Sequence, residues 1–176
     1  MELAARTALW SKKMSEATLN QFFNNELEEI VIPASFSGTF PFFIGNWATN
    51  LKRIIQDGFP SQSSNDISIY TSNQINMPNI EEFYVNCPFY ASHKKNLRIA
   101  KVKNVGSSDY DFYDCGTDAV STDIYCYGQS SDKIHPTKYW SKHIVFHGND
   151  GNRVVYDSAS GAWVIEQDSS SDYNWK

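Results

Sequence analysis

The chain has 176 residues and a formal net charge of −5, from 15 lysines and arginines against 20 aspartates and glutamates. Hydrophobic residues make up 41% and aromatic residues 15% of the sequence, which indicates a folded chain and excludes an intrinsically disordered one. No apolar run approaches the ~20 residues of a transmembrane helix, so we expect no membrane insertion. The mild acidity gives no support to a nucleic-acid-binding surface.

Apolar residues at helical spacing predict a first helix over residues 15–30, ended by Pro33. The side chains expected on its buried face are Leu19, Phe22, Phe23, Leu27 and Ile30. A short apolar strand is predicted next, over residues 40–44. A second helix is predicted over 46–56, with Gly58 as its C-terminal stop.

The middle of the chain mixes strand and helix patterns. Alternating polarity predicts a half-buried strand over 67–72, and helical spacing predicts a helix from 79 to 95 with an interruption at Pro88. Residues 97–105 alternate cleanly and predict another strand. The segment 109–138 is rich in Asp, Tyr, Ser and Gly and gives no clear pattern.

The C-terminal part predicts three strands, over 142–147, 153–157 and 162–167, the first two joined by a hairpin loop at 148–152. Helical patterns therefore come first and strand patterns last. This order predicts an α+β fold, with N-terminal helices followed by a mostly antiparallel sheet.

No repeat or linker divides the chain. We expect an N-terminal helical segment over 1–30, a single α+β domain over 31–168 and a polar tail over 169–176. Residues 1–13 lack the apolar stretch of a signal peptide. They are predicted to form a helix lying on the domain, with an organellar-type leader or a translocation signal as alternatives.

Three cysteines, Cys87, Cys115 and Cys126, cannot close a disulfide framework, and their spacing does not fit a zinc site. We therefore expect free thiols and no metal centre. A chain of this kind is predicted to be soluble and cytoplasmic, with delivery into another cell by a non-Sec route as an alternative.

Cys115, His143 and Asp157 are the first candidate catalytic set. A cysteine nucleophile needs a thiolate, His143 is placed to take the thiol proton, and Asp157 is placed to orient the imidazole. The stretches 114–128 and 143–161 resemble papain-like and transglutaminase-like cysteine hydrolases and deamidases. The alternative is that Cys115 is a buried thiol, His143 an exposed strand residue and Asp157 a turn residue.

A second resemblance covers more of the chain, roughly residues 40–167. The segments that carry it are 42–46, 50–59, 69–72, 97–102 and 139–146. They resemble, in order, strands and a helix of the ADP-ribosyltransferase fold shared by bacterial toxins and the catalytic domain of poly-ADP-ribose polymerases.

That resemblance implies an NAD-binding cleft near Tyr70 and Ser72, with Gln129 in the loop position where the family carries catalytic residues. The sequence departs from the family at two places. Residues 44–45 are Ile-Gly where the family has Arg or His, and Glu166 is the only carboxylate near the late strand that holds the catalytic glutamate. The resemblance therefore implies a divergent enzyme or a catalytically inactive binding module.

Aromatic and acidic residues crowd the segment around 109–140. The aromatic ones are Tyr110, Phe112, Tyr113, Tyr125, Tyr127, Tyr139 and Trp140, and the acidic ones are Asp109, Asp111, Asp114, Asp118, Asp123 and Asp132. Such rings either fill a core or form a protein-binding surface.

Three functions follow from these patterns. The first is a toxin- or effector-type domain of ADP-ribosyltransferase fold that acts on or binds a protein of a target cell, with NAD as a cofactor. The second is a cysteine hydrolase or deamidase. The third is a non-enzymatic, immunity- or inhibitor-like protein that binds a protein partner through the acidic aromatic surface.

Overall fold

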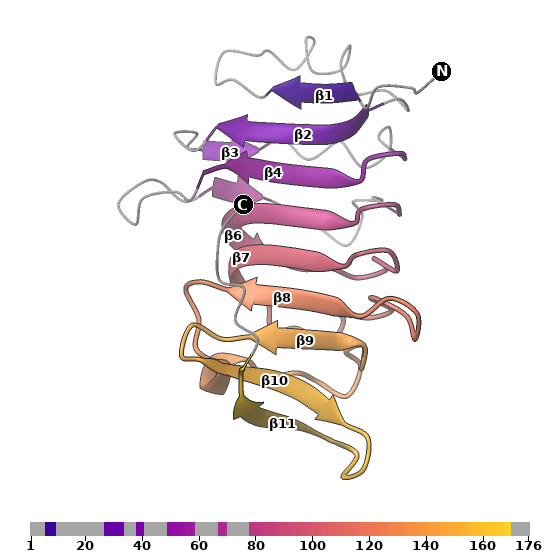
Figure 1. Cartoon of the computed structure of the whole chain (residues 1–176), viewed down its shortest axis with the longest axis vertical. Coiled ribbons are helices and arrows are strands. Elements are labelled where there is room, and N and C mark those ends of the chain that lie inside the picture. The colour runs from indigo at the N-terminus through magenta and orange to yellow at the C-terminus, as the bar shows by residue number, and fades with distance from the viewer. Residues whose placement is uncertain are drawn as a thin grey trace.

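A computed structural model describes residues 6–9, 27–33, 38–40, 49–58, 67–69 and 78–169 (Figure 1). Within these ranges the chain forms eleven β-strands, a short 3₁₀ turn at Ser131–Lys133 and no α-helix. The strands are β1 (Arg6–Leu9), β2 (Leu27–Pro33), β3 (Gly38–Phe40), β4 (Arg53–Asp57), β5 (Ile67–Ile69), β6 (Glu82–Phe89), β7 (Ile99–Val105), β8 (Thr122–Cys126), β9 (Ile144–His147), β10 (Asn152–Asp157) and β11 (Ala162–Gln167).

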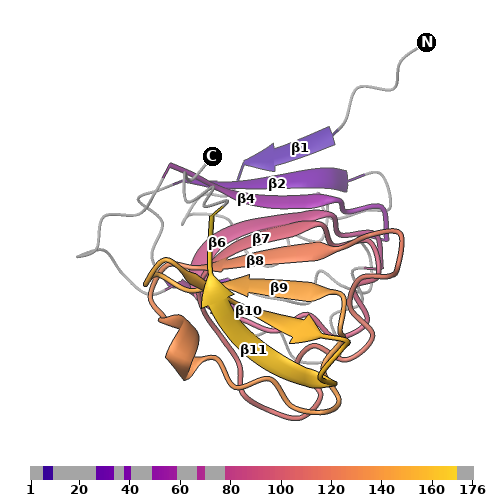
Figure 2. The same cartoon turned by 60° about the horizontal axis from the view of Figure 1, so that its bottom comes forward.

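Nine of these strands form one sheet in the order β1-β2-β4-β6-β7-β8-β9-β10-β11 (Figures 1 and 2). Every neighbouring pair from β1 to β9 is parallel. Parallel neighbours require the chain to return to the same end of the sheet after each strand. The chain therefore winds as a β-solenoid, one strand of this sheet per coil.

Two further features complete the solenoid. Strands β3 and β5, which lie in the returns after β2 and β4, pair in parallel as a second small sheet. At the other end, β10 pairs antiparallel with β9 on one side and with β11 on the other. The stack of coils thus finishes in a hairpin.

The core forms on one face of the large sheet. In-register pairing places one residue from each strand in a continuous column. This inner column consists of Ile30, Ile54, Phe83, Ala100, Ile124, Phe146 and Val154, each at most 2% exposed. Because side chains alternate along a strand, a shift of one residue in any coil would turn its apolar residue outward.

An aromatic cluster packs the lower coils together. Phe112, in the return between β7 and β8, is fully buried and contacts three rings. Its ring centroid lies 4.7 Å from that of Trp140, 5.2 Å from that of Phe146 and 6.2 Å from that of Phe89. The return segments therefore close the core opposite the sheet.

The predicted helices are wrong wherever the structure describes the chain. Residues 27–30 lie in β2, residues 53–56 in β4 and residues 82–89 in β6. Pro88 sits where the register between β6 and β7 shifts, so it marks an irregularity in a strand and not a helix kink. Gly58 has a φ of 84° directly after β4, so it ends a strand.

The fold class is corrected accordingly, from α+β with an antiparallel sheet to an almost entirely β fold with a mostly parallel sheet. The ADP-ribosyltransferase-like architecture expected above is overturned with it. Strands β5, β7, β9, β10 and β11 confirm the strand predictions in their regions. The predictions for residues 15–26 and 41–48 lie outside the described residues.

No helix long and apolar enough to cross a membrane occurs in the part of the chain that the structure describes.

Candidate functional site

Cys115 lies in the core and not at an open site. Its side chain is fully buried, and its Sγ donates to the carbonyl oxygen of Lys94 at 3.6 Å and lies 4.0 Å from Oγ1 of Thr122. Burial raises the pKa of the Cys115 thiol to about 12. The thiol is therefore held in the protonated form, which is a poor nucleophile.

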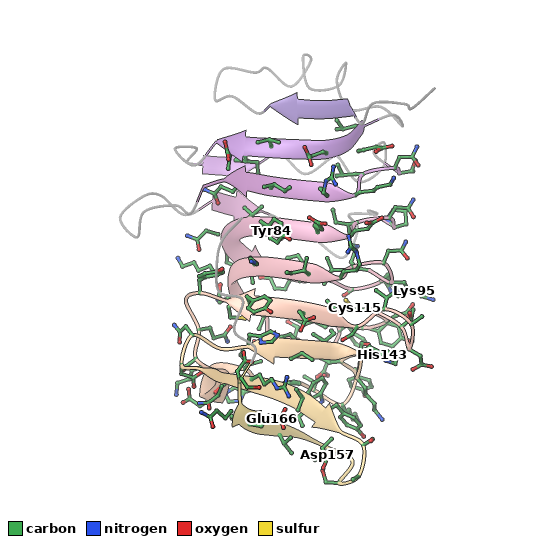
Figure 3. The ribbon with its side chains drawn as sticks, viewed as in Figure 1. Tyr84, Lys95, Cys115, His143, Asp157 and Glu166 are labelled. Carbon is green, nitrogen blue, oxygen red and sulfur yellow. The ribbon has the colours of Figure 1, made fainter. Side chains whose placement is uncertain are left out.

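Cβ of His143 lies beside Gly116, the residue that follows Cys115, but the imidazole ring of His143 pairs with a different residue. A methyl group on Gly116 would lie 3.2 Å from Cβ of His143, whereas Nδ1 of His143 is 3.5 Å from Oδ1 of Asp118. Figure 3 shows Asp157 apart from both, at the far turn of the β10–β11 hairpin. Asp157 accepts hydrogen bonds from backbone nitrogens of that same turn, at 3.0 and 3.2 Å.

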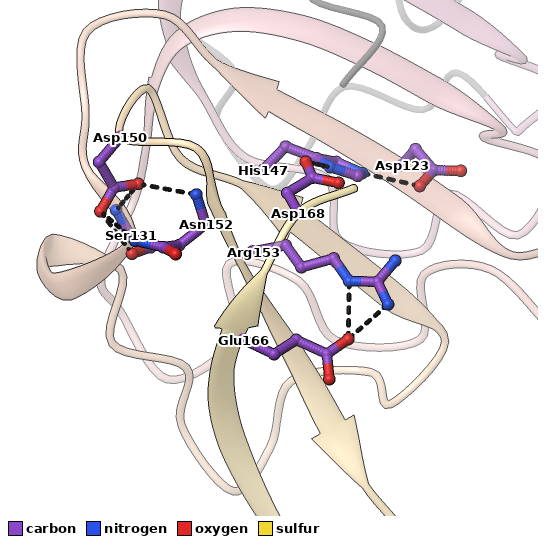
Figure 4. Close-up of polar contacts among 8 residues, drawn as sticks. All are labelled: Asp123, Ser131, His147, Asp150, Asn152, Arg153, Glu166 and Asp168. Carbon is purple, nitrogen blue, oxygen red and sulfur yellow. Dashed lines mark hydrogen bonds and ion pairs between the residues drawn. The ribbon is translucent and has the colours of Figure 1, made fainter. Parts of the chain in front are cut away.

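The residues assigned to the transferase interpretation also fall in different surroundings. Tyr70 and Ser72 lie outside the described residues. Gln129 connects the end of β7 to the 3₁₀ turn, because its Oε1 accepts from the backbone nitrogen of Val105 and its Nε2 donates to the carbonyl of Lys133. Glu166 forms an ion pair with Arg153 across the hairpin (Figure 4). In these contacts Gln129 and Glu166 stabilise the fold.

Three exposed tyrosines form the most distinctive surface feature. Tyr110, Tyr113 and Tyr139 are 55%, 45% and 37% exposed, although large rings are usually covered. Tyr110 stacks on Tyr139 with ring centroids 5.1 Å apart and meets the ring of Tyr113 edge-on at 6.1 Å. We call these three residues the tyrosine platform.

The platform is anchored from below by its own loop. In the sequence Tyr110-Asp111-Phe112-Tyr113 the two middle residues are buried and the two outer ones are exposed. Asp111 accepts from the backbone nitrogen of Ser108 at 2.7 Å, and burial raises the pKa of its carboxyl group. Gly106 is required beside it, because a Cβ there would overlap the Asp111 carboxylate and the Tyr90 ring.

Further hydrogen bonds fix the loop to neighbouring returns. Nε1 of Trp140 donates to the carbonyl of Ser108 at 2.9 Å, and Oγ1 of Thr137 donates to that of Asp109 at 3.1 Å. Ser92 donates to the carbonyl of Tyr110. The platform is therefore preorganised, so little conformational entropy would be lost when a partner covers it.

Backbone strain concentrates at one edge of the platform. His93 and Asp114 have φ angles of 58° and 53°, in the left-handed region that residues other than glycine rarely adopt. They lie against each other, with Nδ1 of His93 3.5 Å from the Asp114 carboxylate, which also pairs with Lys95 at 3.3 Å. The His93 ring meets Tyr113 edge-on at 5.5 Å. Strain of this kind is often retained at binding sites.

A second polar feature lies on the sheet face opposite the core. The outer strip consists of Ile55, Tyr84, Lys101, Tyr125 and His147, which are paired in register and at most 8% exposed. The Lys101 ammonium lies 5.5 and 5.6 Å from the ring centroids of Tyr84 and Tyr125. Tyr125 in turn stacks on the His147 ring at 4.1 Å.

His147 is held between two carboxylates (Figure 4). Its Nδ1 lies 2.6 Å from Oδ2 of Asp168, whose side chain has no exposed surface, and its Nε2 lies 2.9 Å from Oδ1 of Asp123. Both carboxylates receive a hydrogen bond only when both ring nitrogens carry a proton. Through these two contacts the cluster works as a clamp that attaches the chain after β11 to β8 and β9 of the sheet.

The described residues contain no group of three or more His, Cys, Asp or Glu side chains arranged to hold a metal ion. Comparison of the chain with protein-family models, curated proteins and solved structures gives no match of any of the three kinds.

Sequence reasoning found the platform only as a dense aromatic segment. Tyr139 belongs to a different return from Tyr110 and Tyr113, so their contact depends on the stacking of coils. The outer strip was missed entirely. Its one sequence signal is a polar or aromatic residue directly after the buried residue in successive strands, as in Phe83-Tyr84, Ala100-Lys101, Ile124-Tyr125 and Phe146-His147.

Proposed function

We propose that this chain is a non-enzymatic protein-binding domain that contacts its partner through the tyrosine platform. The observation that carries the proposal is the exposure of Tyr110, Tyr113 and Tyr139 in mutual ring contact over an anchored loop. Tyrosine is enriched among the residues that dominate binding energy at protein interfaces, because its rigid ring buries a large area at a small entropy cost.

The enzymatic alternatives have less support in the geometry. The Cys115 thiol is buried with a raised pKa, and Asp157 is engaged in its own turn. The NAD site implied by the transferase resemblance would rest on Tyr70 and Ser72, outside the described residues, and on Gln129, which is occupied by backbone partners. Binding to a protein needs none of these groups.

The test starts by identifying the partner in cells that express the protein. A photo-crosslinking phenylalanine analogue is placed at Tyr110, and the same group at exposed Ala159 serves as the control. We expect a protein crosslinked from position 110 and not from position 159. Equal crosslinking from both positions, or none from position 110, would contradict the proposal.

The purified partner then allows a quantitative test. Tyr110→Ala is expected to weaken its binding by at least about thirtyfold, the loss expected of an interface hot spot. Asp157→Asn, in the turn of the β10–β11 hairpin, is the matched control and should leave affinity unchanged. Added NAD or alkylation with iodoacetamide should not change the affinity, and a large effect of either reagent would favour the corresponding enzymatic alternative.

A further inference from the structure

The last strand of the large sheet exposes an apolar side chain beside the inner column. Val154 of β10, the last member of that column, is 2% exposed and pairs with Ile165 of β11. Ile165 continues the column in register but is 53% exposed. Trp163, two residues earlier and on the same face, packs partly against the core, with its ring centroid 6.0 Å from that of Phe146. The core itself is covered at this end, but the edge strand presents the apolar side chain of Ile165 to solvent.

Strand β11 is also a sheet edge without the usual protection. In the described part of the chain no strand pairs with its outer side. Its sequence, Ala-Trp-Val-Ile-Glu-Gln, has no lysine and no proline, and its pairing with β10 runs without a register shift. Natural edge strands usually carry a lysine, a proline or a bulge that prevents pairing with another chain. The one charge, Glu166, is already paired with Arg153.

We propose that β11 pairs antiparallel with β11 of a second copy of this chain, about a two-fold axis at Val164. This register places Trp163 of one copy opposite Ile165 of the other, twice, and keeps the core faces of both copies on the same side of one continuous sheet. On the opposite face Val164 meets its own equivalent, and Glu166 lies opposite Ala162, so no like charges face each other. A self-complementary surface of this kind is what a two-fold dimer requires.

The pairing uses residues of β11, none of which belongs to the tyrosine platform. The dimer proposal therefore does not depend on the proposed binding function, and either can fail alone. Tyr110→Ser, which alters the platform, should leave the association of the two copies unchanged.

The oligomeric state is measured by analytical ultracentrifugation over a concentration series. We expect the wild-type chain to dimerise and Ile165→Lys to remain monomeric. At a concentration where both chains are monomeric they should have the same melting temperature, because the lysine can stay hydrated at this half-exposed position. Ala159→Lys, in the turn before β11, is the matched control and should dimerise normally. A monomeric wild type at every concentration, or a dimer that survives Ile165→Lys, would overturn the proposal.

A disulfide test checks the register itself. Under mild oxidation Val164→Cys should form a covalent dimer, because the two cysteines would lie directly opposite within disulfide range. Glu166→Cys should not, because the two copies of this position would lie four residues apart along the strand, about 14 Å. The native thiols Cys87, Cys115 and Cys126 are buried and do not compete. Equally efficient crosslinking at both positions would rule out the proposed register.

Discussion

The two faces of the large sheet bury different kinds of side chains, apolar ones on the core face and polar or aromatic ones on the opposite face. The inner column is built almost entirely from aliphatic and phenylalanine side chains, while the outer strip buries a lysine, two tyrosines and a histidine. On the core side the thiols are kept neutral, and burial raises the pKa of Cys87, Cys115 and Cys126. On the outer side the ionisable groups are matched with partners, as in the Asp123–His147–Asp168 cluster.

The two faces contribute differently to the alignment of the coils. An apolar column stabilises by area removed from water but tolerates exchange among similar residues. A column in which Lys101 lies between two tyrosine rings and His147 between two carboxylates depends on particular neighbours. We infer that the inner column supplies most of the stability and that the outer strip favours one alignment of the coils.

The largest effect is expected from truncation of the inner column. Phe83→Ala removes a fully buried ring that stacks on Phe89 at 4.5 Å, and it should lower the free energy of unfolding by about 3–5 kcal/mol. Tyr110→Ala, at a ring that is 55% exposed, is the matched control and should change stability by less than about 0.5 kcal/mol. Urea denaturation measures both, and similar losses would refute the assignment of the core to this face.

An intermediate effect is expected in the outer strip, and it should depend on burial. Asp168→Asn alters the fully buried partner of His147 and should cost about 1–3 kcal/mol. Asp123→Asn alters the other partner of the same ring, which is 42% exposed, and should cost less than about 1 kcal/mol because water screens the pair. If the two variants unfold at the same urea concentration, the cluster does not act as a buried clamp.

The smallest effect is expected from chemical modification of the core thiol. With a pKa of about 12, only about one Cys115 thiol in ten thousand is ionised at about pH 8, so iodoacetamide should not label it in the folded protein. Labelling should become complete once urea unfolds the chain. Rapid labelling of the native protein, lost in His143→Ala, would restore the cysteine hydrolase hypothesis.

The same comparison explains which elements the sequence could predict. Strands β9 to β11 were found because hairpin turns and alternation mark them, and β7 because its residues alternate. Strands β4 and β6 are covered on both faces, so their sequences read as continuous apolar runs such as Ile54-Ile55 and Phe83-Tyr84-Val85. Such runs do not distinguish a buried strand from a buried helix.

Parallel pairing was beyond the reach of local patterns. It joins segments separated by whole returns, such as Ile54 with Phe83 and Ala100 with Ile124, whose association no short window reveals. The site shows the same limit. The exposed tyrosines were recognisable as an aromatic cluster, but the ring contacts of Tyr139 and the carboxylates around His147 exist only because the coils stack in register.

The strands of the large sheet lie side by side in the same order in which they occur along the chain. A sheet of this kind can be lengthened by adding strands. In the described part of the large sheet each strand pairs only with the strands beside it in that order, as in other solenoids whose stability is largely a sum of local terms. Duplicating one whole coil, for example residues 99–121, would add one rung and leave every other coil with neighbours of the same kind. Each added strand would lengthen the large sheet by one strand spacing and move β1 about 4.8 Å further from the β10–β11 hairpin.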